Sequence, residues 1–203
     1  MSRYLSLMVA LLMVAVASTV HAQGPWSLEL RGGPAFPTAD LNDASLGTGA
    51  GFGVAASYRF LPHLGAYAGW DWHRLGLDEP FLGGDYDVED TGYAFGLQFQ
   101  HPMIRSIEGW VRAGGIFNHI EMEDDAGTIV DDSGHELGWE VGGGLSFPLG
   151  RHFALTPGAR YRTFSTTIEI DDAQVPVDLS YLTAEVGLSW TFGARTLSAV
   201  RAR

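Results

Sequence analysis

Charged residues recur singly along otherwise apolar segments of this sequence, and they carry both signs. Arginine side chains can bind carboxylates through two parallel hydrogen bonds, so acids and arginines brought onto one surface would form an ionic network. In a narrow interior each such charge must be paired or hydrated. The residues expected in this network are Glu29, Arg31, Arg59, Asp71, His73, Arg112, Glu140, Arg160, Arg162 and Glu185.

A second kind of cluster contains only acidic residues. Hard cations such as calcium bind several carboxylate oxygens, so these clusters are candidate cation sites. Segment 85–90 lacks both the glycine and the flanking helices of an EF-hand. Solvated loops, or loops that contact a protein or host-surface partner, are the alternative interpretations. The candidate ligands are Asp85, Asp87, Glu89, Asp90, Glu123, Asp124 and Asp125, with further acids at Glu121, Asp131 and Asp132.

Histidines and carboxylates also lie close together in the sequence, which raises the question of catalysis. His119 precedes Glu121 and Glu123, and His135 is followed by Glu136, so an acid–base site is conceivable. No nucleophile is tied to these residues by sequence. Lipid A deacylases would need a serine two residues after a histidine, which none of the seven histidines has. We therefore predict that the protein is not an enzyme and needs no cofactor.

Composition excludes several other classes. The chain has 203 residues, no cysteine and a formal net charge of -12. Nucleic-acid binding requires a basic surface, so an acidic chain is a poor candidate for it. Disulfide scaffolds and thiolate metal sites both require cysteine.

The ends of the chain differ from its body. Residues 1–22 have the positive start, apolar centre and small-residue cleavage site of a secretory signal peptide. A membrane anchor is the alternative, because the apolar stretch approaches the length that spans a bilayer. We expect one domain over residues 23–192, followed by a short basic tail over residues 193–203.

The body alternates apolar and small or polar residues with a period of two, which is the period of β-strands. Short and long connections follow one another between the segments, as in an up-and-down antiparallel barrel. The long ones are expected at 37–48, 77–90, 121–136 and 165–180, and they hold most of the 24 acidic residues. The eight expected strands lie within 26–31, 50–60, 64–73, 93–100, 109–118, 137–147, 155–162 and 182–192.

The distribution of polarity indicates a barrel that is apolar outside. Eight strands enclose room only for side chains or one small ligand, so the many bulky apolar residues cannot all point inward. If they face lipid instead, the charges and glycines fill the interior, and closure pairs the backbone groups. A water-soluble ligand-binding barrel such as a lipocalin is the alternative. We therefore predict an all-β, eight-stranded antiparallel up-and-down transmembrane β-barrel.

Aromatic residues near the strand ends fit two interfacial girdles. An even strand number places both termini on one side, which we expect to be the periplasm. The inner girdle would contain Phe60, Phe99, Phe147, Trp190 and Phe192, and the outer girdle Trp70, Trp72, Tyr93, Trp139 and Tyr161.

The sequence resembles the small bacterial outer-membrane β-barrel superfamily, which includes OmpA-type, OmpX-type and OmpW-like barrels. The most specific match is the last strand, 185–192, where Gly187, Trp190 and Phe192 are similar to the family's assembly signal. One departure is that residues 193–203 follow the aromatic residue that closes most members. The resemblance implies location in the cell outer membrane, contact with its lipid and lipopolysaccharide, and insertion by the barrel-assembly machinery.

The family's barrel serves unrelated roles, so the function is a separate inference. We expect a monomer with a structural or surface-interaction role, a lumen closed by salt bridges, and acidic extracellular loops. An OmpW-like narrow channel for small or apolar solutes is the first alternative, and a lipid A-modifying enzyme is the second.

Overall fold

The computed structural model describes residues 26–39, 46–76, 86–104, 106–124, 129–170 and 173–192. Nearly all of them lie in β-strands, because apolar residues alternate along them with small or polar ones. None of these residues forms a helix long and apolar enough to cross a membrane. The strands are β1 (Trp26–Pro37), β2 (Gly49–Arg59), β3 (Leu64–Gly76), β4 (Tyr86–Ile104), β5 (Ile107–Asp124), β6 (Ile129–Asp132), β7 (Glu136–Leu149), β8 (Phe153–Ile170) and β9 (Ala173–Phe192).

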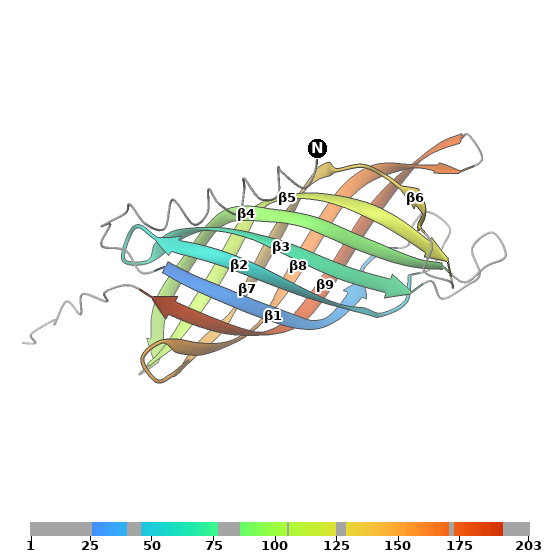
Figure 1. Cartoon of the computed structure of the whole chain (residues 1–203). Coiled ribbons are helices and arrows are strands. Elements are labelled where there is room, and N and C mark those ends of the chain that lie inside the picture. Colours follow the sequence, from blue (N-terminus) through green and yellow to red (C-terminus); the bar gives the residue numbers. More distant parts are fainter. Residues whose placement is uncertain are drawn as a thin grey trace, which may run out of the picture.

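Eight of these strands close into a barrel in which every neighbouring pair is antiparallel (Figure 1). The chain passes from β1 to β5 and then through β7, β8 and β9, and β9 pairs back with β1. The short strand β6 pairs with β5 and lies outside this circle. The predicted eight-stranded up-and-down barrel is therefore confirmed.

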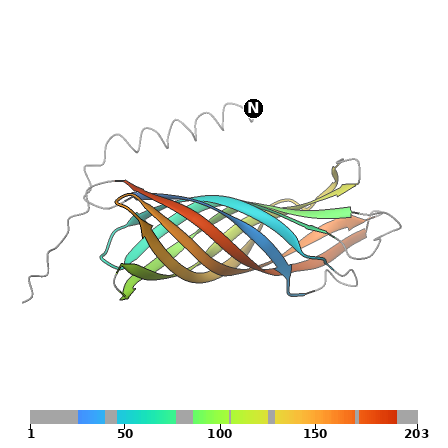
Figure 2. The same ribbon diagram turned by 90° about the horizontal axis from the view of Figure 1, so that it is seen from below.

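The two ends of the barrel differ. At one end, called here the terminal end, Trp26 of β1 pairs with Phe192 of β9. The connections at this end are short, and one of them joins β4 to β5. The β8–β9 hairpin turns at the opposite end of the barrel (Figure 2). The opposite end, called the loop end, holds the connections after β1, β3, β5 and β8.

The connections at the loop end are shorter than the sequence pattern indicates. Strand β4 begins at Tyr86, β5 continues to Asp124, and only residues 171–172 separate β8 from β9. Much of the predicted acidic loop sequence is therefore strand. In these extensions the alternation reverses its polarity, because residues such as Val88 and Leu179 are buried inside the barrel while Asp178 is exposed outside it.

The barrel has the predicted inverted polarity. Leu30 is 61% exposed and Val186 is 57% exposed, whereas Arg160 is 1% exposed. Side chains alternate across each strand, so one face carries the apolar residues outward and the other carries the charges inward. Exposed Tyr93 and Trp139 lie toward the loop end, and exposed Phe192 lies at the terminal end.

Two predicted segments lie outside the described residues. They are the signal peptide, 1–22, and the basic tail, 193–203. The described part of the barrel domain runs from Trp26 to Phe192, within the predicted bounds of 23–192.

Candidate functional site

The interior of the barrel holds a dense set of charged side chains. Each lies on the inward face of a strand, at alternate positions such as Glu29 and Arg31 on β1 or Arg160 and Arg162 on β8. Apart from Arg59, every residue predicted for the ionic network is at most 9% exposed. Burial at this level requires that each charge find a partner, because an unpaired buried ion costs several kcal/mol.

Arg160 is the centre of this network. Its Nη2 donates to both oxygens of Glu185, at 2.7 and 2.6 Å. Its Nη1 donates to Glu140 Oε2 at 3.2 Å and lies 3.5 Å from Asp71 Oδ2. One guanidinium from β8 thus holds carboxylates from β3, β7 and β9.

Arg162 lies beside it on the same face of β8. Its Nε is 3.4 Å from Glu140 Oε2, and its Nη2 is 3.8 Å from Asp71 Oδ2. Its Nη1 is 4.0 Å from Asp90 Oδ2. The two arginines therefore share Glu140 and Asp71, and they extend the network to β4.

Arg31 connects this centre to the terminal-end half of the lumen. Its Nη2 donates to Asp71 Oδ1 at 2.6 Å, and its Nη1 is 3.6 Å from Glu29 Oε2. Glu29 also accepts hydrogen bonds from Arg112 Nη2 at 2.7 Å and from Thr156 Oγ1 at 2.8 Å. The ion pairs are thus continuous across the described interior.

Aromatic rings support the arginines. The guanidinium of Arg112 lies 5.1 Å from the ring centre of Tyr67 and 4.8 Å from that of Trp110. The hydroxyl of Tyr67 also donates to Glu140 Oε1 at 2.7 Å. These cation–π contacts stabilise a charge that has little contact with water.

A smaller cluster of His73, Asp90, Asn118 and Tyr181 bounds the network toward the loop end. The Tyr181 hydroxyl donates to Asp90 Oδ2 at 2.5 Å and lies 3.1 Å from His73 Nδ1. Asn118 Nδ2 donates to the other oxygen of Asp90, also at 2.5 Å. Asp90 thus belongs to the interior rather than to an acidic loop.

The sequence pattern does not reveal all of this cluster. Tyr181 precedes the last expected strand, 182–192, whereas β9 begins at Ala173. Counting in steps of two back from Glu185 would have placed Tyr181 on the inward face. Trp110 could have been found in the same way from Arg112.

Glycines on the inward face provide space for the long charged side chains. A Cβ atom at Gly53 would collide with Asp71 Oδ1, and one at Gly187 would lie 3.0 Å from Glu29 Oε1. The glycine content of the strands is therefore part of the network's packing.

Above the network, toward the loop end, the interior becomes apolar. The buried cluster there includes Ala35, Leu46, Leu75, Val88, Ile120, Val177 and Leu179, each at most 7% exposed. The sequence pattern does not predict this layer, because its residues lie in segments expected to be loops or strand ends.

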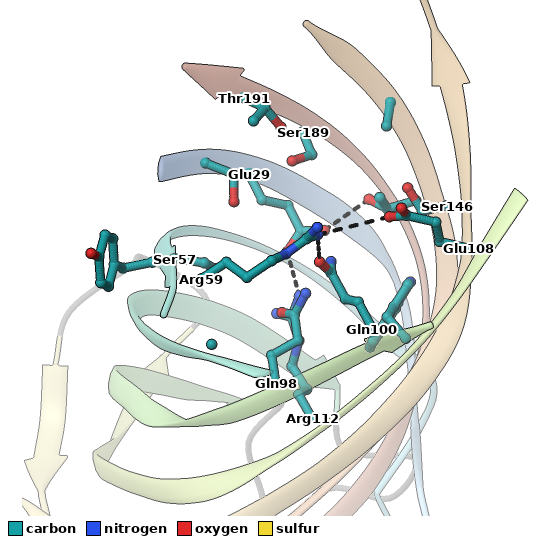
Figure 3. Close-up of a pocket in the computed structure, with 16 residues that line it drawn as sticks. Glu29, Ser57, Arg59, Gln98, Gln100, Glu108, Arg112, Ser146, Ser189 and Thr191 are labelled. Carbon is teal, nitrogen blue, oxygen red and sulfur yellow. Dashed lines mark hydrogen bonds and ion pairs between the residues drawn. The ribbon is translucent and has the colours of Figure 1, made fainter. Parts of the chain in front are cut away.

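Arg59 is separate from the central network. Its Nη2 donates to Gln100 Oε1 and lies 3.8 Å from Glu108 Oε2. These side chains border a cavity of about 60 Å³ at the terminal end, where Figure 3 shows Arg59 reaching among polar side chains from several strands. Arg59 thus lines the lumen as predicted, and its described ion pair is with Glu108, nearer the end of the barrel than the carboxylates around Arg160.

The acidic segment before residue 91 does not form a cation site in the described residues. Alternation along β4 puts Asp90 inward, whereas Asp87 and Glu89 share the opposite face. Arg74 Nη2 is 2.6 Å from Asp87, its Nη1 is 3.5 Å from Glu89, and Trp72 Nε1 donates to Glu89 at 2.9 Å.

No group of three or more potential metal ligands occurs among the residues whose side chains are described. The structure therefore does not bring Asp87, Glu89 and Asp90 together as joint ligands. The remaining candidates lie outside the described residues or their described side chains; they are Asp85, Glu123, Asp124 and Asp125.

His119 lies on the outward face of β5. Its Nε2 is 2.9 Å from Glu121 Oε1, and its ring stands 4.3 Å from that of His135. Phe117 also packs against His135, with ring centres 5.0 Å apart. These contacts form an aromatic and imidazole cluster at the barrel surface. Among the side chains that the structure describes, none brings a hydroxyl into hydrogen-bond contact with either histidine ring.

The residues of the expected assembly signal lie in β9. Trp190 and Phe192 are 47% and 41% exposed and contact each other with ring centres 5.2 Å apart, while Gly187 faces the lumen. They thus form part of the strand that pairs with β1 to close the barrel.

Comparison with known proteins agrees with this architecture. The family model described as "Outer membrane protein beta-barrel domain" matches residues 7–192. A search of curated protein sequences found no significant match.

Several solved structures are similar in fold. OprG from Pseudomonas aeruginosa has a TM-score of 0.56 at 14% identity, covering 86% of this chain and 98% of its own. Neisserial surface protein A has a TM-score of 0.54 at 16% identity, covering 84% of this chain and 98% of its own. Outer membrane protein W of E. coli has a TM-score of 0.53 at 15% identity, covering 85% of this chain and 100% of its own. The chain therefore belongs to the outer membrane protein beta-barrel domain family, and its place is the bacterial outer membrane.

Proposed function

We propose that this protein is a closed outer-membrane barrel with a structural or surface-interaction role, and that it does not conduct solutes. The observation that carries the proposal is the continuous set of ion pairs around Arg160, which joins side chains from opposite walls of the lumen. A passing ion would have to displace these buried pairs, and separating one costs several kcal/mol.

The apolar layer supports the same proposal. Leu75, Val88 and Leu179 are fully buried on the loop side of the ion pairs. A hydrated ion or polar solute would lose its water there without gaining a polar partner. The lumen thus presents two successive barriers of different chemistry.

Planar-bilayer recording tests the closed lumen. The wild-type protein should show no steady single-channel openings, because both barriers are intact. Arg160→Ala should introduce openings if it inserts, since water would then hydrate the three carboxylates that the arginine holds. Arg74→Ala, which removes the same charge near the loop end, should leave the bilayer silent. Steady openings of the wild-type protein would contradict the proposal.

The alternative function is a narrow channel for small or apolar solutes, as the sequence also allowed. The terminal-end cavity around Arg59 favours it, because this part of the lumen is accessible to small polar molecules. Steady conductance or solute uptake by the wild-type protein would support it. An enzymatic role has less support than either of these functions, and we propose that the protein is not an enzyme.

We also propose the orientation and partners of the barrel. Short connections at the terminal end fit the periplasmic turns of outer-membrane barrels, so both termini would lie in the periplasm. The acidic loop end would then face outward, near lipopolysaccharide phosphates. We further propose that the barrel-assembly machinery inserts the protein into the membrane and that the protein is a monomer.

Divalent cations could bridge the loop acids to lipopolysaccharide. Calorimetric titration with calcium should therefore release or absorb heat at millimolar concentrations, because cation binding requires several carboxylates. Asp131→Asn with Asp132→Asn should weaken this heat, while Glu108→Gln at the terminal end should not. Absence of any heat would dismiss cation capture by the loops.

A further inference from the structure

Two histidine rings face each other on the outside of the barrel at the terminal end. His63 lies in the turn between β2 and β3, and His101 lies near the end of β4. Their ring centres are 4.9 Å apart, and the ring planes make an angle of 52°. Both residues are exposed, so an ion in solution can reach their rings.

The backbone brings these two rings together. The N–H of Gln100 donates to the carbonyl oxygen of His63 at 2.8 Å, which extends the β3–β4 pairing by one residue beyond Leu64 and Phe99. His101 lies two residues after Phe99 and therefore on the same outward face of β4. The Phe99 ring stacks with His101 at 6.2 Å and lies 6.0 Å from His63. Strand pairing and a third ring thus hold the two histidines beside each other.

A hydrogen bond decides which nitrogen of His63 can bind an ion. Its Nδ1 lies 2.9 Å from the backbone oxygen of Gln100. A carbonyl oxygen only accepts, so Nδ1 carries the hydrogen, and in the neutral ring Nε2 carries the lone pair. Histidines that bind metals commonly hold their other ring nitrogen in such a bond, which fixes the tautomer and the ring orientation. His63 is therefore arranged to act as a ligand through Nε2.

The separation of the rings fits two ligands of one transition-metal ion. Bonds of about 2.0–2.1 Å from the ion to each ring nitrogen, at angles of about 90–110°, place the ring centres about 4.5–5.2 Å apart. The observed 4.9 Å lies within this range. Imidazole nitrogen suits zinc, copper and nickel, whereas calcium prefers oxygen ligands. In the part of the chain whose side chains are described, no third histidine or carboxylate joins the pair, so water would complete the coordination.

The other histidines of the described barrel lack this arrangement. The rings of His119 and His135 are 4.3 Å apart, but Glu121 occupies Nε2 of His119, and the Nδ1 of that ring is buried. His152 lies at the terminal end, and its Nδ1 is 3.1 Å from the backbone oxygen of Thr191. It has the backbone hydrogen bond, but within the described residues its ring contacts no second histidine.

From these observations we propose that His63 and His101 form a binding site for a divalent late transition-metal ion such as zinc. The ion binds Nε2 of His63 and a ring nitrogen of His101, and it links the β2–β3 turn to β4. The site lies outside the lumen and at the opposite end from the acidic loops. It therefore depends neither on a closed lumen nor on calcium capture by the loops.

Zinc titration of the folded protein, without a histidine tag and in a phosphate-free detergent, tests the site. NMR follows the ring nitrogens of the histidines, because coordination shifts the resonance of the nitrogen that binds. The Nε2 resonance of His63 and one nitrogen resonance of His101 should shift together and saturate at one equivalent of zinc. Calcium at the same concentrations should shift neither.

His63→Gln and His101→Gln should each weaken zinc binding about tenfold or more. Losing only a hydrogen-bond partner of a ligating histidine costs about 10–100-fold in metal affinity, and these substitutions remove a ligand itself. Calorimetry measures the affinities, and heat-modifiable migration on gels checks that each variant folds.

His152→Gln is the matched control, because it removes a histidine with the same backbone hydrogen bond at the same end. His135→Gln tests the other histidine pair. Both variants should bind zinc with unchanged affinity. No saturable shift, an equal response to calcium, unchanged affinity in either ligand variant, or weaker binding in either control would overturn the proposal.

Discussion

Arg160 pairs with three carboxylates in the barrel interior. It contacts Asp71, Glu140 and Glu185 while its side chain is fully buried. We expect Arg160→Ala to destabilise the barrel by about 3–5 kcal/mol, because three carboxylates would lose their main counter-charge. Urea unfolding in lipid vesicles measures the difference, and heat-modifiable migration on gels gives a second readout.

Arg74→Ala provides the comparison for this measurement. Arg74 also contacts two carboxylates, Asp87 and Glu89, but its side chain is 41% exposed. Water can replace it there, so the change should cost about 0–1 kcal/mol. Equal losses in the two variants would show that burial of the ion pairs is not what stabilises the interior.

At the scale of the element, β9 depends on a glycine at its contact with the network. A methyl group at Gly187 would collide with Thr156 Oγ1 and press against Glu29. We expect Gly187→Ala to cost about 1–3 kcal/mol through overpacking, again measured by urea unfolding.

The matched strand substitution is Gly76→Ala, where the nearest atom is 3.7 Å from the added methyl group. Its effect should stay within about 0.5 kcal/mol. If Gly187→Ala lowers the free energy of unfolding as little as Gly76→Ala does, the neighbouring side chains of the network can shift to accommodate the methyl group. The inward glycines would then not be needed for space.

At the scale of the whole molecule, stability depends on the inverted polarity of the barrel. Leu30 is 61% exposed on the face that meets lipid. Leu30→Arg should cost about 2–4 kcal/mol in a bilayer, because it places a charge in the hydrocarbon. Refolding into vesicles of defined composition, followed by urea unfolding, measures this cost.

Leu137, which is 68% exposed and lies toward the loop end, is the positional control. Leu137→Arg should cost about 0–1 kcal/mol, since a long charged side chain near the interface reaches water. Equal costs at both positions would contradict a membrane-spanning orientation along the barrel axis.

The fold could be predicted because strand alternation is a local property. Position along the strand is enough to place Leu28 and Leu30 on one face and Glu29 and Arg31 on the other. Eight such segments, joined by connections that alternate between short and long, indicate a closed barrel. Strand ends were harder to place. Tyr181 and Asp90 lie in extensions where the apolar residues, such as Val88 and Leu179, face inward, so the outward apolar rows that mark the strands stop before them.

Alternation along the sequence predicts the inward set of charges and the outward apolar rows, and the last strand indicates the family. Which charges meet depends on the three-dimensional arrangement of the strands. Arg160 binds Glu185 from the neighbouring strand but also Asp71 from across the lumen, and Arg59 lies apart from both. The reason is geometric: alternation sets the face of each residue, whereas strand tilt and register set its height in the barrel, and partners must match in both.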